Sequence, residues 1–387
     1  MTNLFEIFVR YGEIGLKSPP VRRLMEKQLA NNIRINFDKI GLTDFKIKIN
    51  RSWGRLIVYT SPEAIENNPS IIKKAIFILT KYVFGITSVS PVIRTSSDLE
   101  DIKQISKDLV NANIKNNTSF VVRARRTGNH EYSSLELERL IGEEIYETYA
   151  KEKNLRVNLR NPDYTLNIEV RDEFAFIFDE KYDGFGGLPQ GTQGNIASIL
   201  RGSMEDAIAG FLLCKRGATI LPIIFRKQID QFVSNEKALS EQTRIIDCFQ
   251  PMKKRFYYEV DFDQILNEIG YKKLNCSICD KICIGITERI VANKLKLGIT
   301  LGNHPKAILS RNPEKNFGEK FIPIYYPLIA LNSKEINHPF DIIPKKQFCL
   351  AECPGYKNQK KKRVKPTTQE EINDIVANAK FEFRIRN

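Results

Sequence analysis

The spacing of hydrophobic residues divides the chain into three successive units. In residues 1–68, apolar and polar side chains alternate over Leu4–Val9, and Ser18 with two prolines precedes a run of apolar residues at helical spacing. Two further strand-like segments follow, Phe45–Ile49 and Arg55–Tyr59. The resulting order of strand, helix, strand and strand predicts a small ferredoxin-like domain.

Residues 69–180 carry a second series of helical and alternating segments. The expected helices are Ile71–Phe84, Leu99–Ala112 and Leu135–Tyr149, and the expected strands are Val89–Ile93, Ser119–Arg126, Thr165–Val170 and Glu173–Phe178. Ser133 and Ser134 precede the third helix, where a hydroxyl can accept a hydrogen bond from a backbone N–H group of the first turn. This series predicts a second domain, of the α+β class.

Residues 181–387 begin with a glycine-rich approach to a buried strand, which a turn and a helix follow. These segments are Ile196–Leu200, Arg201–Ser203 and Met204–Lys215, and a second buried strand covers Gly217–Phe225. A turn that enters a helix points backbone N–H groups and the positive end of the helix dipole at one spot, where a phosphate can bind. The same pattern also fits an ordinary first crossover without a ligand.

Later segments extend this α/β pattern. The expected strands are Phe256–Val260, Leu297–Thr300 and Phe321–Tyr326, and the expected helices are Ile229–Leu239, Phe262–Ile269, Cys283–Leu295 and Gln369–Ala379. Strands that alternate with helices predict a doubly wound parallel sheet.

Composition limits the classes of partner. The 387 residues suffice for two or three domains, and a hydrophobic content of 42% supports packed cores. A net charge of +14 favours an acidic partner, nucleic acid before membrane, and a soluble basic protein without such a partner is the alternative. Neither a membrane-length apolar run nor a signal-peptide pattern is present, so we expect a cytoplasmic protein that does not bind membranes.

Five of the seven cysteines form two groups, Cys276, Cys279 and Cys283 in one and Cys349 and Cys353 in the other. Two thiolates separated by two residues in a turn can share a metal ion or cluster. The spacing leaves open an iron–sulfur cluster, a zinc site with four thiolates, a redox disulfide, and unconnected buried cysteines. Cys214 and Cys248 lie in apolar segments and are expected in the core.

Four motifs are spread over most of the chain: Arg10-Tyr-Gly-Glu-Ile-Gly-Leu-Lys17, Gly184-Phe-Gly-Gly-Leu-Pro-Gln-Gly-Thr192, Ala209-Gly-Phe-Leu-Leu-Cys-Lys-Arg-Gly217 and Leu328-Ile-Ala-Leu-Asn-Ser-Lys-Glu-Ile336. Together they resemble the tRNA 4-thiouridine sulfurtransferase family. The resemblance implies a ferredoxin-like domain over 1–68, a THUMP domain over 69–180, and an α/β domain of the adenine-nucleotide alpha-hydrolase, or pyrophosphate-loop, type over 181–387. It also implies thiolation of a tRNA uridine, in which ATP adenylates the base and sulfur is transferred through a cysteine-bound cluster.

The resemblance places a pyrophosphate-binding loop, Ser-Gly-Gly-x-Asp-Ser in the family, at residues 201–206. The corresponding residues are Arg201, Gly202, Ser203, Met204, Glu205 and Asp206, so only the first glycine is retained. All of them except Met204 are the expected contacts of ATP and Mg²⁺. Ser203 restricts backbone approach, Glu205 and Asp206 repel phosphates, and the segment that closes over the nucleotide is shortened to Ile299–Pro305. The alternative is a divergent member that binds tRNA and a metal or iron–sulfur cluster but has lost ATP-dependent catalysis.

The cysteines also acquire roles from the resemblance. Archaeal members of the family hold an iron–sulfur cluster with a Cys-x-x-Cys pair and one distant cysteine. By this resemblance, Cys276 and Cys279 are cluster ligands, and Cys349 or Cys353 is the third ligand. Cys349 and Cys353 are also the candidate catalytic residues, and zinc is the alternative metal.

Basic residues in three segments are candidate RNA contacts: Lys17 and Arg22, then Arg123, Arg125 and Arg126, and finally Lys360, Lys361, Lys362 and Arg363. The middle group ends a strand within the part of the chain that resembles a THUMP domain, where it can contact phosphates without reading sequence. The alternatives are a solvated surface or, for the middle group, a buried salt-bridge set. The expected partner is tRNA, with a sulfur donor and a second copy of the chain as further partners.

Overall fold

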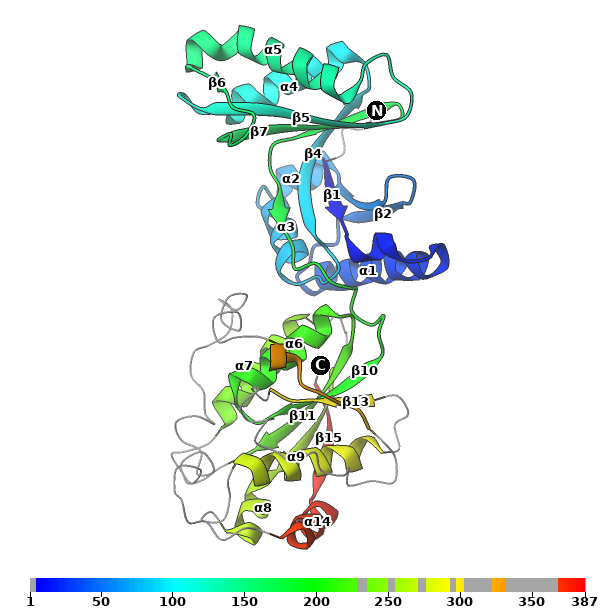
Figure 1. Cartoon of the computed structure of the whole chain (residues 1–387), viewed down its shortest axis with the longest axis vertical. Coiled ribbons are helices and arrows are strands. Elements are labelled where there is room, and N and C mark those ends of the chain that lie inside the picture. The colour runs from blue at the N-terminus through cyan, green and yellow to red at the C-terminus, as the bar shows by residue number, and fades with distance from the viewer. Residues whose placement is uncertain are drawn as a thin grey trace. The chain divides into compact units, whose positions relative to one another are not determined.

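The computed structural model describes residues 5–227, 235–249, 255–270, 276–292, 297–302, 322–330 and 368–386. The chain forms two compact units, Met1–Gly186 and Gly187–Asn387 (Figure 1).

The first half of unit 1 has a ferredoxin-like order of elements. It consists of β1 (Phe5–Arg10), the 3-10 helix η1 (Glu13–Leu16), α1 (Pro19–Lys39), β2 (Lys46–Asn50), β3 (Arg55–Thr60), α2 (Pro62–Asn67), α3 (Ile71–Lys81) and β4 (Ser88–Ser96). Strands β2, β3, β1 and β4 lie side by side in that order, all antiparallel. The β-α-β-β-α-β order is therefore complete only at β4.

The second half of unit 1 packs two helices on one sheet face. It consists of α4 (Leu99–Asn113), β5 (Ser119–Thr127), α5 (Ser134–Lys153), β6 (Arg156–Val157), β7 (Tyr164–Arg171), β8 (Phe174–Phe178) and β9 (Tyr182–Asp183). Alternate residues of β5, β7 and β8 join the apolar residues of α4 and α5 in one buried core. Ser133 and Glu136 form a reciprocal cap at the start of α5, which confirms the predicted helix start.

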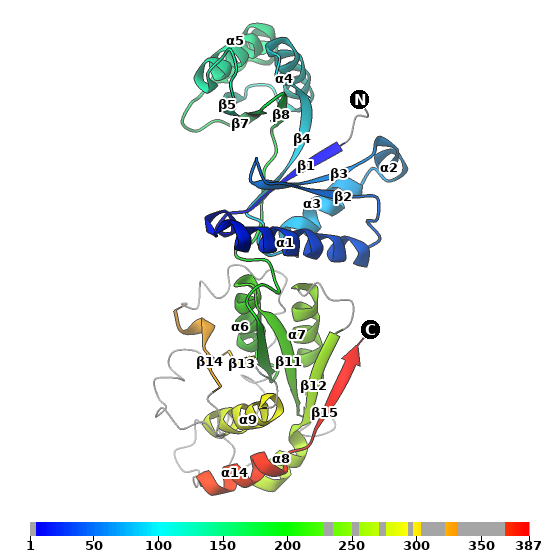
Figure 2. The ribbon, with the colours of Figure 1, turned by 90° about the vertical axis from the view of Figure 1, so that its right-hand side faces the viewer.

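Strand β4 belongs to both halves of unit 1. Its residues 88–92 pair with β1, and its residues 93–96 pair with β8. As a result, the described strands of unit 1 form one continuous nine-stranded sheet, with β9 paired to β4 off the main path (Figure 2).

A buried ion cluster lies where these halves meet. Glu169 of β7 is 7% exposed, and its carboxylate contacts Arg10 at 3.1 Å, Arg55 at 2.6 Å and Arg171 at 3.2 Å. Burial acts to raise the pKa of Glu169, but Arg55 and Arg10 outweigh it, so the pKa lies below its ordinary value of 4.5. The cluster therefore joins β1, β3 and β7 through one ionised carboxylate.

We expect Glu169→Gln to destabilise the protein by about 3–5 kcal/mol at neutral pH, because it leaves the arginines without their counter-charge. A carboxyl group with a lowered folded-state pKa contributes stability above its unfolded-state pKa and loses it as the pH falls through the folded-state pKa. The difference between variant and wild type should therefore shrink below pH 4.5. Urea unfolding at several pH values measures both effects. Glu143→Gln, which breaks an exposed pair with Arg139, is the control and should cost under about 1 kcal/mol; equal costs would contradict the prediction.

Unit 2 is built on a parallel sheet. Its described elements are β10 (Asn195–Leu200), α6 (Met204–Lys215), β11 (Thr219–Arg226), α7 (Glu236–Phe249), β12 (Arg255–Asp261), α8 (Phe262–Ile269), α9 (Cys276–Val291), β13 (Leu297–Thr300), β14 (Ile324–Tyr325), the 3-10 helix η2 (Pro327–Ala330), α14 (Gln369–Asn378) and β15 (Phe381–Arg386). The strand order is β14-β13-β10-β11-β12-β15, and among these described strands only β15 runs antiparallel to its neighbour.

Helices cover both faces of this sheet. Helices α8, α9 and α14 lie on one side of the sheet (Figure 2). Their apolar residues pack on Ala197, Ile199 and Phe225 of β10 and β11 in one buried core. On the opposite face, Gly210 of α6 approaches Ser198 of β10 and Ile246 of α7. The predicted fold class, with its doubly wound sheet, is confirmed.

The predicted domain boundaries at residues 68 and 180 stay predictions. Within the described part of the chain, no helix combines the length and apolar character that crossing a bilayer requires.

Candidate nucleotide and cysteine site

The turn between β10 and α6 is shaped by two small residues. Gly202 has a φ of 93°, a left-handed conformation that glycine adopts without steric cost. Ser203 is the N-cap of α6, and its hydroxyl accepts a hydrogen bond from the Asp206 backbone N–H group at 3.3 Å. The strand, turn and helix predicted at this point are therefore confirmed.

Arg201 is the charged centre of the turn. The side chain is buried, and its Nε and Nη2 atoms donate to the Asp206 carboxylate at 3.0 and 2.6 Å. Its Nη1 atom donates to Asp280 Oδ1, at the start of α9. Burial acts to lower the pKa of Arg201, but the Asp206 carboxylate raises it, so the pKa stands well above its ordinary value.

Residues from three other segments hold the backbone of the turn. Gln242 of α7 accepts from the Gly202 N–H group at 3.2 Å and donates to the Ser203 carbonyl oxygen. Asn235 donates to the carbonyl oxygen of Arg201 at 3.1 Å. The Gly302 N–H group donates to Asp206 Oδ1 at 2.9 Å, and a Cβ atom on Gly302 would lie 2.0 Å from the Glu205 backbone. Only glycine permits this close approach.

The cysteines of the first group lie on α9. Cys276 opens the helix and is half-buried, while Cys279 and Cys283 are buried one turn apart. The sequence interpretation placed the Cys-x-x-Cys pair in a turn, and this is wrong, because the apolar residues Ile278 and Ile282 extend the helical spacing back to Cys276 and are buried. Burial raises the pKa of Cys283 well above its ordinary value of 9.0, which favours the thiol.

Lys227, at the end of β11, faces Cys279. Its side chain is 1% exposed, its Nζ atom lies 3.3 Å from Cys279 Sγ, and it stands 4.7 Å from the centre of the Phe262 ring. Asn235 accepts from the Lys227 backbone N–H group at 2.8 Å, so the same asparagine contacts the backbone of both Arg201 and Lys227. The turn and the cysteine helix are therefore parts of one buried polar network.

The basic residues of the first unit are partly accessible. Arg123 and Arg125 of β5 are exposed. Arg123 donates a hydrogen bond to the Leu159 carbonyl oxygen at 2.5 Å, and Arg126 donates one to the Gly128 carbonyl oxygen at 2.9 Å. Among the described residues, none of these three arginines forms an ion pair, so they are not the buried salt-bridge set that was the alternative. The buried ion pairs of this unit are instead those of Glu169.

Arg22 of α1 donates to Glu26 and to the Tyr11 hydroxyl, both at 2.9 Å. Lys17 is exposed just after η1.

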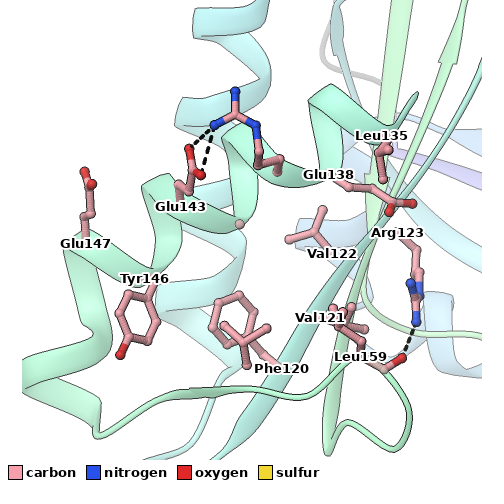
Figure 3. A pocket seen from close by; sticks show the side chains of 13 residues that line it. Phe120, Val121, Val122, Arg123, Leu135, Glu138, Glu143, Tyr146, Glu147 and Leu159 are labelled. Carbon is pink, nitrogen blue, oxygen red and sulfur yellow. Dashed lines mark hydrogen bonds and ion pairs between the residues drawn. The ribbon is translucent and has the colours of Figure 1, made fainter. Parts of the chain in front are cut away.

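Beside Arg123 lies an apolar cavity of about 650 Å³ between α5 and the strand β5 (Figure 3). Its lining includes the exposed side chains of Leu135, Tyr146 and Leu159. Glu143 on its rim is paired with Arg139.

Sequence comparisons identify both halves of unit 1 and relate most of the chain to one family. Residues 6–90 match the ThiI ferredoxin-like domain, and residues 96–179 match the THUMP domain. A probable tRNA sulfurtransferase of Methanosarcina acetivorans is 31% identical over 339 residues, which cover 85% of this chain and 79% of the relative. The chain belongs to the tRNA sulfurtransferase family. A probable tRNA sulfurtransferase of Methanocaldococcus jannaschii, 29% identical, aligns with 96% of this chain and 97% of its own.

Two solved structures share the fold of this tRNA sulfurtransferase family member. PH1313 from Pyrococcus horikoshii is 27% identical in sequence and superposes with a TM-score of 0.59. The match covers 86% of this chain and 97% of the PH1313 chain. A 4-thiouridine synthetase in complex with RNA and bound ATP is 23% identical, covers 98% of this chain and 99% of its own, and gives a TM-score of 0.67. The family resemblance inferred from the sequence is confirmed.

The candidate ATP contacts of this family member do come together at one turn, but the turn does not fit a triphosphate in this arrangement. Two of its N–H groups, those of Gly202 and Asp206, already donate within the protein. The Arg201 guanidinium already pairs with the carboxylates of Asp206 and Asp280, so a phosphate would have to compete with both of them. The predicted roles of these residues in ATP binding stay predictions.

The candidate metal and catalytic cysteines are only partly placed. Cys276 and Cys279 lie on α9, whereas Cys349 and Cys353 fall outside the described residues, as do Lys360, Lys361, Lys362 and Arg363. Within the described ranges, no three potential metal ligands cluster. Cys214 lies in the core as expected, where Gln190 donates to its sulfur at 3.3 Å, and the side chain of Cys248 falls outside the description.

Sequence reasoning missed Lys227, Asn235, Gln242 and Asp280 as parts of this site. Asp280 directly follows the Cys-x-x-Cys pair, and that position was the one available signal.

Proposed function

We propose that this protein thiolates a uridine of tRNA, replacing the C4 carbonyl oxygen of the base with sulfur. The observation that carries the proposal is the buried network that joins the β10–α6 turn to the cysteine helix α9 through Arg201 and Asp280. Activation of a base and delivery of sulfur must occur at one place, and this network holds the two elements together. Relatives that align with most of the chain are named tRNA sulfurtransferases, which favours catalysis over mere tRNA binding.

In this proposal, unit 1 binds the tRNA and unit 2 carries the reactive site. Arg123 and Arg125 are exposed within β5, where they contact phosphates of the tRNA backbone. Cys279, buried beside Lys227, lies in a site from which bulk water is excluded. ATP, when bound, supplies the adenylyl group that turns the uridine oxygen into a leaving group. A protein that modifies tRNA acts where tRNA is found, so we place it in the cytoplasm.

We further propose that Cys276 and Cys279 hold an iron–sulfur cluster with Cys349 or Cys353. Thiolates are the donors that such clusters prefer, and the two placed cysteines are one helical turn apart. Purified anaerobic protein should contain iron and labile sulfide, and changing Cys276 to alanine should remove both. Stoichiometric zinc without sulfide would instead identify a structural zinc site. The sulfur donor and a homodimer stay predictions.

Mass spectrometry of tRNA nucleosides tests the proposed function. Cells that lack the gene should lose a thiolated uridine, and the wild-type gene should restore it. Unchanged thiouridine in the deletion strain would overturn the proposal and favour the alternative, a divergent member that binds tRNA and a metal but does not modify the base.

A further inference from the structure

We propose that the edge strand β15 is the surface through which two copies of this chain associate. In the proposed dimer, β15 (Phe381–Arg386) of one copy pairs antiparallel with β15 of the other, and the two-fold axis passes through Phe383. The proposal concerns assembly alone and does not depend on the proposed function. Three features of β15 support it: its position in the sheet, its exposed apolar face and the order of its charges.

Strand β15 lies at one edge of the sheet of unit 2 (Figure 2). Among the described strands its one neighbour is β12, to which it is antiparallel over six residue pairs. The outer backbone N–H and C=O groups of an edge strand can pair with a strand of another molecule, and natural edges are commonly blocked by a proline, a bulge or an inward-pointing charge. β15 contains no proline, and its pairing with β12 continues without a bulge. This edge is therefore suited to pairing.

One face of β15 is apolar and partly open to solvent. Phe381, Phe383 and Ile385 share this face, because side chains alternate along a strand. Phe381 packs against the core formed with α8, α9 and α14, but Phe383 is 49% exposed and Ile385 is 56% exposed. Phe256 of β12 is 38% exposed, and its ring stacks on that of Phe383 with 5.8 Å between the ring centroids. Exposed apolar side chains that lie together in this way favour an interaction surface.

The order of residues in β15 is complementary to itself. When two copies pair antiparallel about Phe383, this residue lies opposite the partner's Phe383, and Phe381 lies opposite the partner's Ile385. Opposite residues of an antiparallel pair lie on the same face, so the apolar faces of the two strands join. On the other face, Glu382 lies opposite the partner's Arg384, and Arg384 lies opposite the partner's Glu382.

Neighbouring registers lack this match. Centring the pair on Glu382 brings two glutamates together, and centring it on Arg384 brings two arginines together, and like charges directly opposite each other are destabilising. A pair that is centred between two residues places the apolar face of one strand beside the polar face of the other. The register about Phe383 is therefore the symmetric one that matches both the apolar and the charged residues.

The charges of β15 are accessible to a partner. The side chains of Glu382 and Arg384 are 67% and 53% exposed, and the two form an ion pair with each other. Glu382 also lies directly opposite Glu259 of β12, which pairs with Arg226. A second β15 strand would bring its own Arg384 to Glu382, and the four side chains would then form a ring of alternating charge.

Sedimentation velocity on the full, nuclease-treated chain over a range of concentrations tests the association without mass from bound RNA. Wild type should shift from the monomer mass to twice that mass as the concentration rises. Because each chain contributes one six-residue strand, we expect a concentration-dependent dimer rather than a permanent one. Wild type that stays monomeric at every concentration overturns the proposal.

Two charge-reversal variants test the surface. Glu382→Arg places arginines opposite each other across the two-fold axis, and Arg384→Glu places glutamates opposite each other. Each should raise the dissociation constant of the dimer by about tenfold or more, because two attractive pairs become repulsive. Glu268→Arg, the same change of charge at an exposed position of α8, is the control and should associate like wild type.

Mixing the two variants tests the register. A chain with Glu382→Arg and a chain with Arg384→Glu carry opposite charges at both positions, so the mixture should form a heterodimer. The double variant, with both substitutions in one chain, should again associate with itself. A variant that had merely unfolded would recover in neither case.

Each remaining outcome contradicts the proposal. A dimer that both single substitutions leave unchanged lies on another surface, and failure of the mixed variants to associate rules out the register about Phe383. None of these measurements uses thiolation, so a failed dimer leaves the proposed function standing, and unchanged thiouridine in the deletion strain leaves the dimer standing.

Discussion

Cys279→Ser is expected to abolish tRNA thiolation. Loss of a group that forms the reactive bond costs a factor on the order of 10⁴–10⁶ in rate in well-studied enzymes. A serine hydroxyl at this position neither carries sulfur nor binds iron as a thiolate does, so the loss is expected whether Cys279 acts as carrier or as cluster ligand. Its place beside Lys227 and directly before Asp280 leaves no other described cysteine in an equivalent position. Thiouridine formed per tRNA, quantified by mass spectrometry, measures the effect.

Cys283→Ala is the matched control for this prediction. Cys283 lies one turn further along α9, and burial raises the pKa of its thiol, so it is a poor nucleophile. Its replacement should cost stability but leave most of the thiolation rate. Equal loss in the two variants, or thiolation that persists in Cys279→Ser, would contradict the assignment.

Binding of tRNA should weaken steeply with salt. A protein that neutralises six to ten phosphates loses about 10³- to 10⁵-fold in affinity between 50 and 200 mM salt, because bound counterions are released from the RNA. The exposed arginines of β5 and the net charge of +14 motivate this expectation. Filter binding or fluorescence anisotropy at several salt concentrations gives the slope directly.

Replacing Arg123, Arg125 and Arg126 with glutamine should reduce that slope by about one for each phosphate that the protein no longer neutralises. Arg139→Gln is the control: this arginine is exposed in the same half of unit 1, but Glu143 at 2.8 Å already balances its charge. A salt dependence that is flat in wild type, or unaltered in the triple variant, would place the RNA on another surface.

The sequence predicted local elements better than their tertiary interactions. The turn at Arg201–Ser203 was recognisable because glycine and serine have strong local preferences there. The alternation in β15 is equally regular, but as an edge strand at the end of the chain it was missed.

The pairing of Arg201 with Asp280 could not be predicted by the same means. The two residues are separated by 79 positions, and their contact depends on how α9 lies across the sheet, which no local pattern encodes. The same holds for Glu169 and its three arginines, because these four residues lie on three different strands. Charges of this kind look like solvated surface in a sequence, and only tertiary structure shows that they are buried.

The two halves of unit 1 share strand β4, and this strand fixes the distance between them. No linker separates the ferredoxin-like part from the THUMP part, since one strand pairs with β1 and then with β8. Their spacing along β4 is set by its residue count, at about 3.3 Å per residue. Adding a single residue would make the side chains that follow it in β4 point to the opposite face of the sheet. The distance between any two surface points on the two halves is therefore set by the strand that they share.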